Sequence, residues 1–123
     1  MTKVSEVMML EKLILQMKTY EGLTLKQGQI VDKALRPWME ALRDFYVNKN
    51  KGVDKYGTVK EDKVKSCVEG DPMFETYKGE LMEYLEMQVE LGEPLLDGDW
   101  FPELRVSSEI ASLAERVCLI KEA

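Results

Sequence analysis

The chain contains no histidine, and this absence removes several kinds of chemistry. Without an imidazole there is no Ser–His or Cys–His nucleophile pair, no histidine general base and no Glu-x-x-His motif of di-metal carboxylate bundles. Only two cysteines are present, Cys67 and Cys118, and two distant thiols cannot supply a structural zinc ligand set. Both lie among apolar neighbours at helical spacing, which favours small buried thiols over a disulfide. We therefore expect no metal site and no bound cofactor.

Long hydrophobic runs and phosphate-binding glycine patterns are also absent. No apolar stretch approaches the roughly 20 residues of a membrane-spanning helix, and the first residues lack the pattern of a signal peptide. The glycines match neither a phosphate-cradling loop nor an EF-hand. These absences predict a cytoplasmic protein without a membrane partner. The length of 123 residues fits a single helical domain over residues 1–123.

Positive and negative side chains are unevenly divided between the two halves of the chain. Residues 1–65 hold 13 lysines and arginines against 9 acidic residues, whereas residues 66–123 hold 4 against 14. The two halves therefore carry net charges of +4 and −10 within a total of −6. Such a dipolar chain attracts basic surfaces to one end and acidic surfaces to the other. Because the whole chain is acidic, direct nucleic-acid binding is not expected.

Helical periodicity is the main signal that is present. Apolar side chains recur every three to four residues, which predicts an all-α fold. We expect a compact bundle of four main helices plus one short helix. Residues 95–101 form either a tight turn that carries Trp100 and Phe101 onto the core or a small irregular hairpin. The expected helices cover residues 5–20, 25–46, 58–69, 72–91 and 108–120.

Capping residues mark where these helices begin. A Thr followed three residues later by Gln or Glu forms a capping box, and an Asp-Pro pair is typical of an N-cap followed by the first helical residue. Pro37 lies inside the second apolar pattern, where we expect a kink rather than two helices. The predicted N-caps are Thr24, Thr58, Asp71 and either Ser107 or Ser108.

Residues 48–57 are polar and contain two glycines, which predicts the one clear loop and the most mobile segment. Lysines gather in and after it, so the segment is either a solubilising loop or an anion-binding loop. The candidate anion-binding residues are Lys49, Lys51, Lys55 and Lys60.

A row of glutamates runs along the predicted helix at residues 72–91, and its last member lies just beyond that helix. Neighbouring like charges at this spacing repel mildly, and no lysine is interleaved to compensate. The row is either a solvated helix face or a binding surface for a basic partner. Paired carboxylates would do acid–base work only in a water-excluded cleft. The candidate residues are Glu80, Glu83, Glu86, Glu90 and Glu93.

The first predicted helix is apolar on two faces. At about 100° per residue, Met8 and Leu15 fall on a different side from the main apolar stripe. The helix is therefore either central in the bundle or carries an extra face for an oligomer contact.

The pattern of helix ends has a counterpart in a known group of proteins. It comprises Phe45-Tyr46, Lys55-Tyr56-Gly57, Asp71, Phe74, Leu81, Leu85 and Val89, followed by a Pro-interrupted turn and a short closing helix. Over residues 25–120 this pattern resembles short uncharacterised helical proteins encoded by tailed phages. The resemblance implies a phage or prophage accessory protein that acts by contact, and it transfers no functional residue.

These observations predict a non-catalytic helical protein that works by protein–protein contact and forms a homo-oligomer. An alternative is an acidic, charge-mimicking inhibitor of a nucleic-acid-binding enzyme. A second alternative is a small enzyme that uses paired carboxylates.

Overall fold

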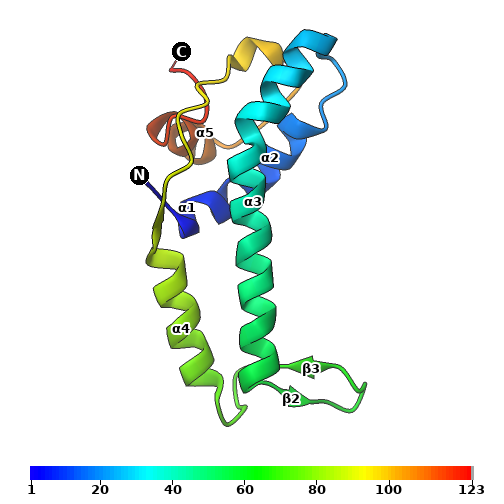
Figure 1. The fold of residues 1–123 in the computed structure, drawn as a ribbon, viewed down its shortest axis with the longest axis vertical. Coiled ribbons are helices and arrows are strands. Elements are labelled where there is room, and N and C mark those ends of the chain that lie inside the picture. The colour runs from blue at the N-terminus through cyan, green and yellow to red at the C-terminus, as the bar shows by residue number, and fades with distance from the viewer. Residues whose placement is uncertain (123) are drawn as a thin grey trace.

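The computed structural model describes residues 1–122 as an elongated, mainly helical molecule (Figure 1). Helix α3 runs along most of its length, and the other elements pack beside it. The prediction of a mainly helical chain is confirmed, but two antiparallel pairs of short strands were not predicted. In chain order the elements are β1 (Thr2–Lys3), α1 (Val4–Met9), α2 (Glu11–Lys18), α3 (Leu25–Tyr56), β2 (Thr58–Val59), β3 (Lys65–Ser66), α4 (Phe74–Glu86), β4 (Gln88–Val89), the 3-10 helix η1 (Gly98–Trp100) and α5 (Ser108–Arg116).

Helix α3 begins at its predicted cap. The Thr24 hydroxyl accepts the Gln27 N–H at 3.1 Å, and the Gln27 side chain accepts the Thr24 N–H at 3.0 Å, so the capping box is confirmed. Pro37 lies inside α3 without dividing it, as predicted. Proline removes one helical hydrogen bond, and packing of the flanking apolar face holds the helix together there.

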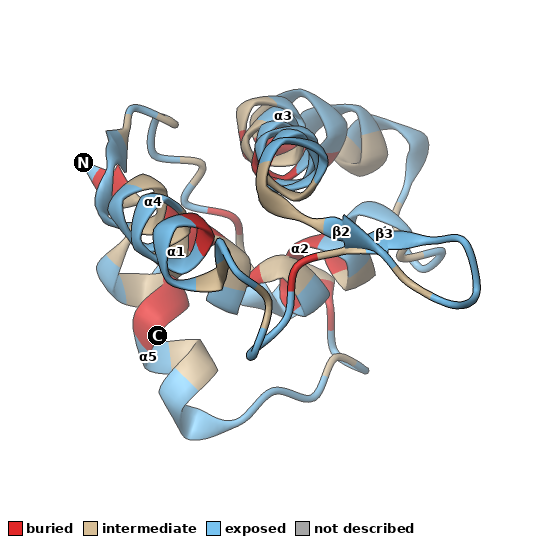
Figure 2. Cartoon of the chain, turned by 90° about the horizontal axis from the view of Figure 1, so that it is seen from below, coloured by how far each residue is buried: buried red, intermediate tan, exposed pale blue. Residues whose placement is uncertain are grey.

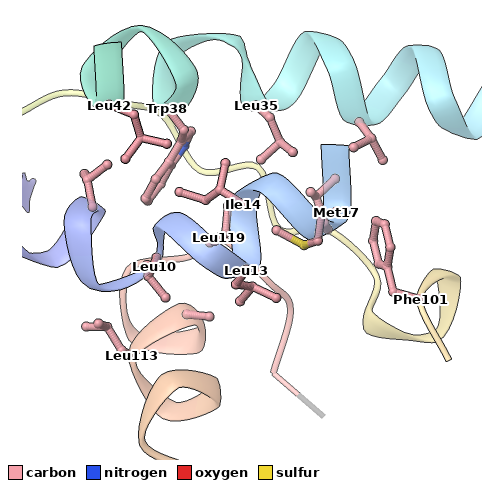
Figure 3. Packing of buried hydrophobic residues seen from close by; sticks show 14 residues of the cluster. Leu10, Leu13, Ile14, Met17, Leu35, Trp38, Leu42, Phe101, Leu113 and Leu119 are labelled. Carbon is pink, nitrogen blue, oxygen red and sulfur yellow. The ribbon is translucent and has the colours of Figure 1, made fainter. Parts of the chain in front are cut away.

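The first half of α3 packs against α2 through a row of large side chains (Figure 3). Leu35, Trp38 and Leu42 point from α3 toward α2, and burial of each such side chain contributes about 1.5–3 kcal/mol. The indole N–H of Trp38 finds no acceptor among the described residues, a cost that burial of the ring outweighs. The core cluster consists of Val7, Leu10, Leu13, Ile14, Met17, Val31, Leu35, Trp38, Leu42, Leu96, Phe101, Leu113, Ala114 and Leu119.

The N-terminal helix differs from the prediction. Residues 5–20 do not form one helix, because α1 ends and α2 begins on either side of Leu10. The Leu10 N–H contacts the carbonyls of Glu6 at 3.2 Å and Val7 at 3.1 Å, which tightens this turn. Both short helices contact α3, so the expected helix with two apolar faces is instead two helices that each turn an apolar face to the core.

Helix α5 and the residues after it close the core. The Ser107 hydroxyl accepts the Ile110 N–H at 3.2 Å, which confirms the cap at Ser107. Beyond α5 the chain returns beside the segment that precedes η1, and Leu96 and Ile120 form a parallel bridge.

The segment around η1 forms the predicted tight turn. The Asp97 side chain accepts the Asp99 N–H at 2.9 Å and begins a single 3-10 turn. Phe101 is then buried in the core, and Trp100 packs partly buried against it. The alternative hairpin near residues 95–101 does not form.

The predicted loop at residues 48–57 is wrong, because α3 continues through it to Tyr56. Lysine is a good helix former, so the turns on both sides of Gly52 are helical and α3 continues through the glycine. Gly52 has a packing role, since a Cβ there would lie 2.9 Å from the ring of Tyr77 on α4. The glycine therefore marks a close helix–helix approach and not a chain break.

The predicted short helix at residues 58–69 is also wrong. Thr58 and Val59 pair antiparallel with Ser66 and Lys65, so the segment is a β-hairpin. Its turn is closed by a hydrogen bond of 2.9 Å from the Lys63 N–H to the Lys60 carbonyl. The β-branched residues of this segment favour strands, and this preference prevails over the Thr58 capping pattern.

Helix α4 is shorter than predicted at both ends. It begins at Phe74 instead of Pro72, with Met73 and not Asp71 at the N-cap. It ends at Glu86 instead of Leu91, because the chain extends at Met87 and β4 then pairs with β1. This pairing joins the start of the chain to a segment more than eighty residues away, which local periodicity cannot reveal.

The molecule divides into two regions of different packing. The body comprises residues 4–42, which include α1, α2 and the first half of α3, together with residues 91–122, and it contains the whole core cluster. The arm comprises residues 43–86, in which only Phe45, Cys67 and Tyr77 are buried. Figure 2 shows the arm as mostly exposed, with the β2–β3 hairpin projecting to one side. The predicted bundle therefore has its core at one end of α3 only.

Candidate functional site: a groove between α3 and α4

A groove lies in the arm between the second half of α3 and α4. The two helices meet at two levels. The rings of Phe45 and Tyr84 lie 6.1 Å apart, and the Asn48 amide donates to the Tyr84 hydroxyl at 3.4 Å. Further along, the ring of Tyr77 lies against the backbone at Gly52. These contacts leave a groove of about 250 Å³ between the helices.

The groove combines an apolar floor with charged walls. Tyr77, Leu81 and Tyr84 come from α4 at helical spacing and form the floor. Lys51 and Lys55 line the α3 side, and Glu80 lines the α4 side. Such a mixture suits the recognition of an apolar group flanked by charge.

One of the two lysines of this wall lies beside an aromatic ring. The Lys55 ammonium lies 5.0 Å from the centre of the Tyr56 ring, a cation–π distance. The pKa of Lys55 is raised, chiefly by the Tyr56 side chain and further by the negative charge of Glu80. Lys55 is therefore positively charged at neutral pH.

The predicted glutamate row is divided between different elements. Glu80, Glu83 and Glu86 lie on α4, but Glu90 and Glu93 follow β4 and belong to no helix. Glu86 pairs with Lys3 at 2.9 Å and so joins α4 to the start of the chain. Only Glu80 lines the groove. The five residues therefore do not form one helical ridge.

The predicted lysine loop is divided in the same way. Lys49, Lys51 and Lys55 lie on α3, whereas Lys60 lies in the hairpin. The Lys60 ammonium contacts Asp71 at 2.5 Å and is therefore neutralised by a carboxylate. The structure brings only Lys51 and Lys55 into the groove, on a helix and not in a loop.

The predicted oligomer face is also divided. Met8 lies on α1 and packs partly buried against the core cluster, while Leu15 lies on α2 and is 42% exposed. The bend at Leu10 places them on separate helices. They do not form a continuous apolar face of one helix.

Asp71 fastens the hairpin to the start of α4. Besides Lys60, its carboxylate accepts the Val68 N–H at 2.8 Å. The pKa of Asp71 is lowered below its usual value, first by the Lys60 hydrogen bond and then by the Val68 N–H. Lys65 also donates to the backbone carbonyl of Asp54 at the end of α3. The base of the hairpin is thus bound on both sides.

Within residues 1–122, no group of three or more His, Cys, Asp or Glu side chains is arranged to hold a metal ion. Cys67 and Cys118 are both free thiols, the first buried and the second partly buried. None of the helices in this range has the length and apolar run that would cross a membrane.

Comparison with known proteins gives no assignment: no family model, no curated protein and no solved structure matches the chain.

The groove itself was not predicted from the sequence. The sequence places the floor residues in the helix predicted at residues 72–91 and Gly52 in the loop predicted at residues 48–57. A signal was present, since Asn48, Gly52 and Tyr56 recur every fourth residue and continue the apolar face of α3. That spacing indicates a helix face that packs against another helix of the same chain at Gly52.

Proposed function

We propose that the protein is non-catalytic and binds another protein through its arm. The observation that supports this proposal is the groove between α3 and α4, with an apolar floor and walls of opposite charge. Aromatic and apolar anchors surrounded by charged residues are typical of binding surfaces. The resemblance to phage accessory proteins agrees with a contact role, and its implication of a phage or prophage origin stays a prediction.

The packing of the arm supports the same proposal. Apolar side chains lie exposed along it, with Met82 at 56% and Met73 at 43% exposure. The hairpin adds Val59 and Val64, which are 67% and 59% exposed. Methionine adapts its shape to different surfaces, which suits a partner contact. A partner that covered these side chains would supply the burial that the arm lacks by itself.

The charge-mimicking alternative has a smaller basis. Glu80 and Glu83 lie exposed on α4 and take part in none of the ion pairs among residues 1–122. Two such carboxylates make a shorter row than the five that the sequence suggests. The acid–base alternative needs carboxylates shielded from water, and these two are open to solvent.

The proposed function can be tested by capture of partners from the source cell. The bait is the full chain, and the arm variant is Lys51→Glu with Lys55→Glu. The matched control is Lys26→Glu with Lys33→Glu, which makes the same charge change at two exposed positions in the first half of the same helix.

We expect the native chain and the control to capture the same partner, and the arm variant to lose it. A partner that both double variants retain equally, or that both lose equally, would contradict a role for the arm. Circular dichroism of each variant establishes that helix content is kept.

A further inference from the structure

We propose that the groove is occupied by the arm of a second copy of this chain, so that two α3–α4 pairs form a four-helix bundle. The inference rests on the proposed function and identifies the partner. Three observations carry it: the two-helix layer, the opposite charges of the two groove walls, and the position of the lysine wall on α3.

The arm is one half of a layered structure. In the arm α3 and α4 run side by side, joined through the hairpin segment, and no third helix of residues 1–122 covers the groove (Figure 1). A pair of helices with an apolar face needs a second layer against that face. The groove floor has only half-buried side chains beside Tyr77, so that face is unfilled in the single chain.

The charges of the groove are self-complementary. Lys51 and Lys55 line one wall and Glu80 the other, with Glu83 one turn beyond on α4. None of the four takes part in the ion pairs among residues 1–122. A two-fold axis parallel to α3 would set the α3 of each copy opposite the α4 of the other at the same height. Each lysine wall would then face a glutamate wall, as an isologous interface requires.

Apolar residues flank these charges on the same helix faces. Met73 and Met87 stand at the two caps of α4, each seven residues from Glu80, and both are exposed. Val47 precedes Lys51 by four residues on α3 and is exposed as well. Residues seven or four apart lie on one side of a helix, so apolar contacts would border the charge pairs in the dimer.

The lysine wall of the groove lies off the core side of α3. At about 100° per residue, Lys51 and Lys55 lie about 100–180° around α3 from Trp38 and Leu42, which point into the body. Asn48, Gly52 and Tyr56 of the same groove continue the core side, so only the lysine wall of the groove lies beyond it.

The test uses sedimentation velocity on the purified full chain and two charge-reversed variants. One variant is Lys51→Glu with Lys55→Glu, and the other is Glu80→Lys with Glu83→Lys. We expect the native chain to sediment as a dimer at micromolar concentration, with twice the 14.2 kDa chain mass. Each variant alone should be monomeric, because facing like charges weaken the dimer by about a hundredfold or more.

An equimolar mixture of the two variants is the decisive sample. The all-acidic groove of one should pair with the all-basic groove of the other, which restores a dimer of both chains. The control Lys26→Glu with Lys33→Glu should remain dimeric. Added salt should weaken the native dimer, because screening reduces the charge term.

Three results would overturn the proposal: a native chain that stays monomeric at every soluble concentration, a dimer unaffected by either charge reversal, or a mixture that does not associate. A monomeric native chain whose capture of another protein still depends on Lys51 and Lys55 would refute the second copy and leave the proposed function intact. If capture is also independent of these lysines, both proposals fail.

Discussion

The body and the arm share one helix but are stabilised in different ways. Residues 25–42 of α3 contribute four members to the core cluster, while residues 43–56 contribute none. The body is held by apolar burial, and the arm by a few aromatic contacts and hydrogen bonds. The same continuous helix therefore carries a stable end and an end whose surface is open for contact.

Polar contacts join the start of the chain to the end of α4, beside the packing of α1 on α4. β1 pairs with β4, the Val4 N–H donates to the Met87 carbonyl at 2.9 Å, and Lys3 pairs with Glu86. A surface ion pair of this kind contributes little. Because the whole core cluster lies in the body, loosening of α4 would leave these core residues packed, and the following predictions test this difference between body and arm.

The largest expected difference is between two leucine truncations. Leu35→Ala removes a fully buried side chain from the body and should lower the free energy of unfolding by about 2–5 kcal/mol. Leu81→Ala removes a half-buried side chain from the groove floor and should cost about 1 kcal/mol. Urea unfolding measures both. Both sites are helical, so helix propensity favours alanine equally and cancels in the comparison. Equal losses would mean that the arm is packed as tightly as the body.

A smaller effect is expected from two glycines of α3. Gly28→Ala meets no atom within 4 Å and should stabilise the chain by about 0.5–1 kcal/mol, because alanine is the better helix former. Gly52→Ala meets the Tyr77 ring at 2.9 Å, so the clash should offset that gain or exceed it. Thermal unfolding of the two variants makes the comparison. If Gly52→Ala stabilises as much as Gly28→Ala, α3 and α4 do not depend on close approach at this glycine.

The smallest effect concerns pH and the hairpin. The lowered pKa of Asp71 means that its contribution to stability is present above the ordinary value of 3.8 and is lost as the pH falls through the lowered pKa. We expect the Val68 amide signal to report this titration by NMR. Lys60→Met removes the main cause, so the pKa of Asp71 should rise toward its ordinary value. An unchanged titration in that variant would show that Lys60 does not hold the carboxylate.

Local sequence signals predicted the parts of the fold that depend on local contacts. The caps at Thr24 and Ser107, the passage of α3 through Pro37 and the tight turn before Phe101 all follow from residues within a few positions of each other. Each of these features depends on contacts between residues that are near one another in the sequence.

The errors arose where distant segments decide the outcome. The end of α4 at Glu86 depends on pairing with residues 2–3, which no local pattern contains. Thr58 has the sequence of a cap, but pairing with Ser66 makes it a strand residue. Gly52 has the sequence of a loop, yet Tyr77 packs on it within a helix. The groove was missed for the same reason, because it exists only once α3 and α4 lie side by side.

The most direct test of the division into body and arm is amide hydrogen exchange along α3 itself. In the dilute Lys51→Glu, Lys55→Glu variant, the amides of residues 35–42 should exchange only on global unfolding, while those of residues 49–56 should exchange at least about tenfold faster through local opening. One helix in one sample provides both measurements, so solvent conditions cancel. Equal protection along the two halves of α3 would contradict the account.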